Sequence, residues 1–113
     1  MIDSMINRSA LIVRPKKPYL DWAAGLDDSG VSADIKGDET VYLIPEIDDE
    51  EQMKRVLKGL FSDIFERELM AWHTDESAWP QPRSMALFRQ WFELEFHGIV
   101  EDLGHDMIED AED

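Results

Sequence analysis

Two short runs of aliphatic and β-branched residues predict β-strands. The first run, Ala10–Val13, is closed by Pro15, and the second run, Thr40–Ile44, is followed by Pro45. Residues of these types favour strands, and proline cannot supply the amide hydrogen that continues a ladder. We therefore expect one strand at each run.

Two long stripes of apolar residues predict helices in the second half of the chain. The i, i+3, i+4, i+7 spacing of a core-facing helix runs over residues 49–72 and again over residues 83–103. Asp48, with Glu51 three residues later, predicts the N-cap of the first helix, and Gly104 predicts the end of the second. We expect both helices to be long and mutually antiparallel.

A shorter apolar stripe predicts a third helix over residues 18–26, because Pro18 suits the first turn of a helix. Residues 27–39 are dense in turn-forming residues and show no sustained periodicity, so we expect a loop there. The order of elements along the chain is then β-α-β-α-α.

Together these elements predict an α+β fold, with a small two-stranded sheet packed against two long antiparallel helices and one short helix. The segment between the strands, residues 14–39, is long enough for a right-handed crossover, which favours parallel pairing. A two-stranded sheet is marginally stable and has open edges, so dimerisation could extend it. Alternatively, the helices cover the pair and the basic residues around the first strand guard its edge.

The length of 113 residues is typical of one domain. We expect a single α+β domain over residues 1–104. Residues 105–113 are acidic and terminal. Segments of this kind are poorly ordered unless they dock, so we expect a mobile acidic tail.

The chain is strongly acidic, with 26 Asp and Glu against 11 Lys and Arg and a formal net charge of -15. Of these, 18 acids and 6 bases lie in residues 48–113. Such a charge repels phosphates and anionic lipid headgroups, so direct binding to nucleic acid or to a membrane is disfavoured. The absence of cysteine excludes disulfides and Cys-ligated metal. No apolar run has the length of a signal peptide or a membrane span, and we expect a cytoplasmic protein.

The segment between the two long predicted helices is the least generic part of the chain. It gathers aromatic, acidic, hydroxyl and basic side chains in one loop, and loops on rigid scaffolds often carry function. The alternative is ordinary packing, in which two Trp residues fill the end of the helix pair and Thr74 caps a short helical turn. The candidate binding residues are Trp72, His73, Asp75, Glu76, Trp79 and Arg83.

No catalytic residue, metal ligand or cofactor is predicted. Glu93, His97, Glu101 and His105 recur at steps of four and would lie along one helix face, yet no paired metal-binding motif accompanies them. The Ser, His and Asp residues of the loop lack a nucleophile elbow, and no Walker loop, dinucleotide fingerprint or EF-hand occurs. A metal site and a hydrolase triad are therefore minor alternatives.

Several short motifs resemble small acidic bacterial proteins of unknown function. The resemblance spans about residues 10–103 and implies a bacterial, cytoplasmic, single-domain protein. It implies no activity, ligand or functional residue. The motifs are Val13-Arg14-Pro15-Lys16-Lys17-Pro18, Tyr42-Leu43-Ile44-Pro45-Glu46, Trp72-His73-Thr74-Asp75-Glu76, Trp79-Pro80 and Trp91-Phe92.

These observations lead to three hypotheses for function. The first is a non-catalytic protein-binding or regulatory module, whose acidic helical surface meets a basic protein partner. A homodimer is compatible with the open sheet edges. The second is a small enzyme or metal-binding protein with its site at the Trp72–Arg83 helix junction. The third is a nucleic-acid mimic, although Lys54, Arg55, Lys58 and Arg67 interrupt the acidity of the first long helix.

Overall fold

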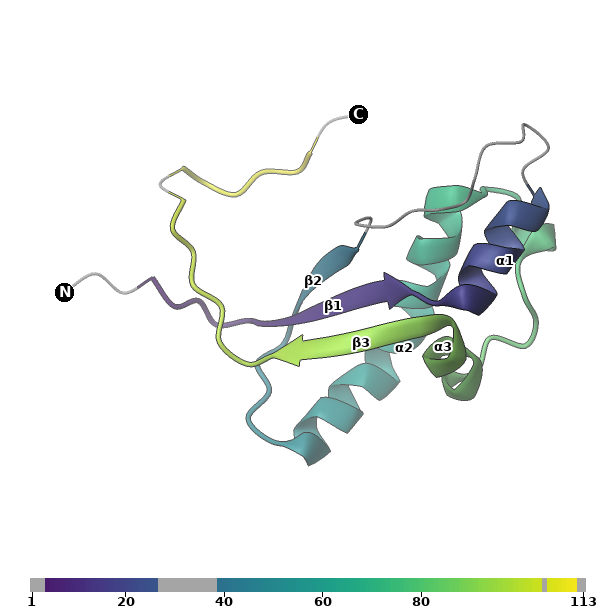
Figure 1. Ribbon diagram of the computed structural model, residues 1–113. Helices are drawn as coiled ribbons and strands as arrows, with labels where there is room; N and C mark the ends of the chain where they lie inside the picture. The colour runs from purple at the N-terminus through teal and green to yellow at the C-terminus, as the bar shows by residue number, and fades with distance from the viewer. Residues whose placement is uncertain (1–3, 27–38, 105, 112–113) are drawn as a thin grey trace.

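The computed structural model describes residues 4–26, 39–104 and 106–111. This part of the chain forms an α+β fold with a three-stranded antiparallel sheet and three α-helices (Figure 1). The elements in chain order are β1 (Ser9–Pro15), α1 (Lys17–Leu26), β2 (Thr40–Ile44), α2 (Glu50–Trp72), the short 3-10 helix η1 (Glu76–Ala78), α3 (Met85–Trp91) and β3 (Phe92–His97).

Strand β1 lies at the centre of the sheet, in the order β2-β1-β3, and both of its pairings are antiparallel. Leu11 of β1 lies opposite Tyr42 of β2 and Phe96 of β3. The predicted two-stranded sheet and the predicted parallel pairing are therefore wrong. A parallel crossover needs a connection that runs back along the sheet, whereas α1 leads away from the end of β1 (Figure 1).

The helix predicted over residues 83–103 is confirmed only for residues 85–91 and is wrong beyond them. The helix α3 has 7 residues, and the chain then continues directly into β3. In β3, Phe92, Leu94 and Phe96 lie opposite buried or half-buried residues of β1, while the residues between them are polar. This alternation of apolar and polar residues is typical of a half-buried strand. The aromatic residues also have helical spacing, but pairing with β1 stabilises the strand instead of a helix.

The other predicted elements are confirmed to within a residue or two, namely both strands, the short helix and the long helix α2. The N-cap of α2 is Asp49 rather than Asp48, because the Asp49 carboxylate accepts the Gln52 N–H at 2.8 Å. The side chain of Gln52 in turn accepts the Asp48 N–H at 2.8 Å. The loop predicted over residues 27–39 lies outside the described residues except for Glu39.

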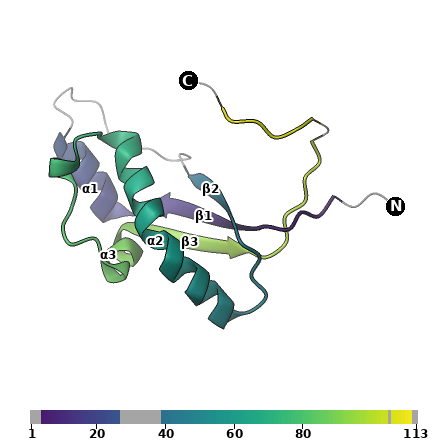
Figure 2. The same cartoon turned by 180° about the vertical axis from the view of Figure 1, so that it is seen from behind.

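Helix α2 crosses one face of the sheet, here called the inner face, and α1 and α3 lie together at one end of the sheet (Figures 1 and 2). The core between these layers is rich in aromatic rings. The Phe65 ring of α2 lies edge-on to Phe92 of β3, with 5.5 Å between ring centroids, and 5.6 Å from Phe88 of α3. None of the described helices is long and apolar enough to cross a membrane.

The segments that precede β1 and follow β3 run side by side just beyond the sheet, and the C-terminal segment then turns away (Figure 1). The Ile6 N–H donates to the Val100 carbonyl at 2.9 Å, and the Asp102 N–H donates to the Ser4 carbonyl at 2.7 Å. Residues 106–111 are exposed and have no regular secondary structure. Whether residues 105–113 form a mobile tail, as the sequence predicts, is not tested by this structure.

Candidate functional site

The connection between α2 and α3 is anchored by indole hydrogen bonds. The Trp79 indole N–H donates to the His73 carbonyl at 2.9 Å, and the Trp72 indole N–H donates to the Ala23 carbonyl of α1 at 3.0 Å. A third indole, that of Trp22 in α1, donates to the carbonyl of Ala78 at 2.9 Å. These bonds and the burial of Trp79, which is 4% exposed, join the connection to α1.

The polar residues of this connection also have partners within it. The Asp75 carboxylate caps η1 and accepts from the N–H and the hydroxyl of Ser77, at 3.0 and 2.7 Å. These hydrogen bonds favour the charged form and lower the pKa of Asp75. The cap is therefore Asp75, and not Thr74 as the packing alternative supposes. Glu76, in the first turn of η1, is exposed.

Arg83 closes the segment against the buried indole. Its guanidinium lies 5.5 Å from the centroid of the Trp79 ring, donates to the Pro80 carbonyl at 3.3 Å and is 3.9 Å from the Glu66 carboxylate. The structure thus brings Arg83, Trp79 and the His73 backbone together, while Asp75 and Glu76 are exposed. These contacts account for the segment as packing, and ligand binding by its six candidate residues stays a prediction.

The residues at steps of four do not share a helix face. Glu93 and His97 lie on the outer face of β3, Glu101 forms an isolated bridge with Met5, and His105 lies outside the described residues. Among the described residues, no group of three or more His, Asp or Glu side chains is placed to hold a metal ion.

The outer face of β3 instead carries a network of ion pairs centred on Arg14 of β1. Its guanidinium is 2.7 Å from the Glu95 carboxylate, 3.2 Å from that of Glu39 and 3.8 Å from that of Glu93. The His97 ring also contacts the Glu95 carboxylate. His97 and Arg14 together hold the pKa of Glu95 below its usual range. This half of the outer face is therefore occupied by charged groups that neutralise one another in part.

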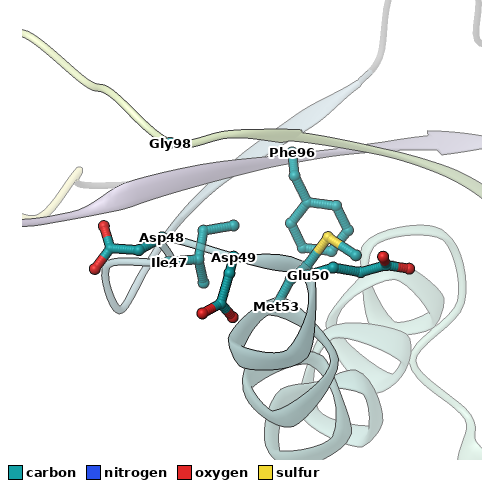
Figure 3. A pocket seen from close by; sticks show the side chains of 7 residues that line it. All are labelled: Ile47, Asp48, Asp49, Glu50, Met53, Phe96 and Gly98. Atoms are coloured by element: carbon teal, nitrogen blue, oxygen red, sulfur yellow. The ribbon is translucent and has the colours of Figure 1, made fainter.

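A different site emerges where the start of α2 meets the end of β3. A cavity of about 210 Å³ lies there, which we call the acid-rimmed pocket. Figure 3 shows Phe96 reaching from β3 towards Met53 of α2, with Ile47 beside them and the acidic side chains around this apolar group. The lining residues are Ile47, Asp48, Asp49, Glu50, Met53, Phe96 and Gly98.

A buried serine holds the two walls of the pocket together. Ser9 of β1 is fully buried, and its hydroxyl accepts the Ile47 N–H at 3.0 Å and donates to the Gly98 carbonyl at 3.1 Å. The walls are close, since a Cβ on Gly98 would lie 3.6 Å from the Ile47 carbonyl oxygen. Ser9 therefore determines how the β2–α2 connection sits against the end of β3.

The rim of the pocket is the most acidic stretch of the described chain near α2. Residues 46–51 contain five acids and no base, whereas residues 52–72 contain three acids and four bases. The Asp49 carboxylate caps the helix, and Glu50 lies 3.5 Å from Lys54. The acidity that the sequence suggests for a whole helical surface is thus concentrated at the first turn of α2.

Another polar group is buried under the sheet. Glu68 of α2 is 6% exposed, and its carboxylate accepts the hydroxyl of Tyr42 on β2. The Tyr19 hydroxyl donates to the Glu68 backbone carbonyl at 2.7 Å. Burial, together with the Glu68 charge, raises the pKa of both phenols well above their usual range. These bonds join α1 and β2 to α2.

Comparisons with protein-family models, with curated proteins and with solved structures give no match. The acid-rimmed pocket has no signal in the sequence, because residues 48–51 have the pattern of a capping run and Phe96 and Gly98 fall within the predicted helix over residues 83–103.

Proposed function

We propose that the protein is a non-catalytic binding module that takes a basic segment of a protein partner at the acid-rimmed pocket. The observation that supports this proposal is the pairing of an apolar floor with an acidic rim. Ile47, Met53 and Phe96 supply the floor, and the carboxylates of Asp48 and Glu50 lie at the rim.

A lysine or arginine side chain matches both parts of the pocket. Its aliphatic stem packs on apolar surface while its charged head stays near water and carboxylates. The cavity of about 210 Å³ is small, which favours one side chain over a drug-sized ligand. A basic segment therefore fits the pocket as a single inserted side chain with neighbouring cations on the rim.

The charge of the whole chain supports the same partner. A net charge of -15 attracts a basic surface at long range and speeds its encounter, and salt screens this attraction. The four bases in residues 52–72 interrupt the negative surface that a nucleic-acid mimic would present along α2. The two alternative functions, a small enzyme or metal-binding protein and a nucleic-acid mimic, are not favoured by any feature of the pocket.

Affinity capture with the full chain tests the proposal. We expect a partner with a basic surface to be retained in stoichiometric amount at low salt and released at high salt. The variant Asp48→Asn with Glu50→Gln should lose this partner, because it removes two rim charges and keeps the Asp49 cap. A matched control, Glu109→Gln with Asp110→Asn, removes two charges from the exposed C-terminal segment and should retain it.

Two results would contradict the proposal. One is a partner that the rim variant retains as well as the wild type does. The other is a partner whose retention does not change between low and high salt.

A further inference from the structure

Strand β2 is an edge of the sheet. In the strand order β2-β1-β3, no other strand of the described chain lies on its outer side. Alternate backbone N–H and C=O groups of an edge strand point away from the sheet and can pair with another strand. Its five residues, Thr40–Ile44, include no Asp, Glu, Lys, Arg or proline, so no charged or proline residue within the strand guards this edge.

The side chains of this edge are also apolar on the open face of the sheet. Val41 is 59% exposed and Leu43 is 51% exposed. By the register of the sheet, Val41 lies opposite Ile12 and Leu43 lies opposite Ala10. The β2 half of the outer face is thus an apolar strip that ends at the strand edge.

The opposite edge is protected by charge. The outward side chains of β3 are Glu93, Glu95 and His97, and the Arg14 network holds the first two. Charged side chains of this kind discourage a further strand from pairing. The two edges of the described sheet therefore differ, and β2 is the one whose own residues leave it open to a further strand.

We propose that β2 pairs with β2 of a second copy of this chain, antiparallel and about a two-fold axis at Tyr42. In this register Val41 lies opposite Leu43 of the second copy, and Thr40 lies opposite Ile44 of the second copy. Opposed residues lie on the same face of the sheet in any antiparallel pair, and here the exposed apolar side chains of Val41 and Leu43 would cover each other on both sides of the two-fold axis. The result is a continuous six-stranded sheet.

The residues that would meet at this strand carry no charge. Two chains of net charge -15 repel each other, and the paired residues Thr40–Ile44 add no carboxylate to this repulsion. The acid next to the strand, Glu39, is held by Arg14 at 3.2 Å and would lie opposite Pro45 of the second copy. Like-charge repulsion predicts that salt strengthens this contact, whereas salt weakens the binding of a basic partner.

Analytical ultracentrifugation of the full chain tests the interface. We expect self-association that rises with protein concentration from micromolar to millimolar and that strengthens with salt, because a five-residue strand gives a small interface. The variant Val41→Glu with Leu43→Glu should stay monomeric. A matched control, Met70→Glu, changes a similarly exposed apolar residue on α2, which is 47% exposed, and should associate as the wild type does.

Disulfide trapping tests the register, since the chain has no native cysteine. Val41→Cys with Leu43→Cys should give a covalent dimer on oxidation, because opposed residues of antiparallel strands come within about 4.5–5.5 Å between Cα atoms. Val41→Cys alone should not, because residue 41 of each copy is offset by two positions. The proposal is wrong if the wild type is monomeric at every concentration and salt level, if salt weakens the dimer, or if Val41→Glu with Leu43→Glu dimerises.

The interface is separate from the acid-rimmed pocket, so each proposal can fail alone. The variant Val41→Glu with Leu43→Glu leaves the pocket residues intact and should still bind a basic partner.

Discussion

At the scale of single residues, Ser9 connects two segments of the chain that are distant in sequence. Its hydroxyl joins the Ile47 N–H and the Gly98 carbonyl, two groups that are 51 residues apart in the chain and that line opposite walls of the pocket. Ser9 is fully buried, and a buried polar group that loses its hydrogen-bond partner lowers the free energy of unfolding. Both hydrogen bonds of Ser9 therefore stabilise the folded chain.

We expect Ser9→Ala to lower the free energy of unfolding by about 1–3 kcal/mol, because it leaves two backbone groups without their partner. Urea denaturation followed by circular dichroism measures this change. The control is Ser62→Ala on the exposed side of α2, which should change stability by less than about 0.5 kcal/mol. Equal effects of the two substitutions would show that Ser9 does not join the walls.

Tyr42, which donates to the Glu68 carboxylate, and Tyr19 make stability depend on alkaline pH. Both Tyr42 and Tyr19 have raised pKa values in the folded chain, so the folded state holds these phenols protonated where the unfolded state releases protons. Their stabilising contribution is complete below pH of about 10, the ordinary pKa of tyrosine, and is lost as pH rises towards the folded values.

We expect Tyr42→Phe to lower stability at pH 7 by about 1.5–3 kcal/mol, because it removes a hydrogen bond to a buried carboxylate. Above pH 10 the variant should lose stability less steeply than the wild type, so that the two curves converge. Tyr19→Phe removes a bond to a neutral carbonyl and should cost only about 1 kcal/mol at pH 7. Parallel stability curves of the wild type and Tyr42→Phe up to pH 12 would contradict this account.

At the scale of elements, the connection from α2 to α3 is stabilised mainly by its indoles. We expect Trp79→Ala to cost about 3–5 kcal/mol, as is usual for a fully buried Trp. If that variant does not fold, Trp79→Phe isolates the loss of the hydrogen bond to the His73 carbonyl. His73→Ala keeps that carbonyl and should change stability by less than about 0.5 kcal/mol. Thermal unfolding measures all three, and a larger loss from His73→Ala than from Trp79→Phe would contradict the packing account.

Sequence patterns predicted the elements that depend on local spacing. The strand at Thr40–Ile44 and the long stripe of α2 are of this kind. The predicted helix fails after Trp91, because Phe92 and Phe96 continue the helical spacing of Phe88 and Trp91. The alternation of residues 92–97 is a strand signal only when β1 lies beside it. Which strand lies beside residues 92–97 is decided by tertiary structure, and a local sequence pattern does not predict it.

The candidate sites show the same limit. The capping role of the acids before α2 follows from their spacing, although the cap lies one residue later than predicted. The pocket needs Phe96 and Gly98 beside Ile47, and this proximity depends on β3 and on the buried Ser9. The edge strand likewise becomes visible only when the strand order is known.

At the scale of the whole molecule, the described chain presents two surfaces with opposite responses to salt. The acid-rimmed pocket favours a basic segment and should lose it as salt rises, while the β2 edge favours a second copy and should gain it. The surfaces lie on different elements, so one molecule could use both at once.

The most direct test of the binding module is nuclear magnetic resonance titration of the ¹⁵N-labelled full chain with a lysine-rich peptide, at low and at high salt. We predict that amide shifts concentrate at Ile47, Met53 and Gly98, weaken at high salt and are absent with an acidic peptide of equal length. Shifts that fall elsewhere, or that are the same for both peptides, would contradict the claim that the acid-rimmed pocket takes a basic segment.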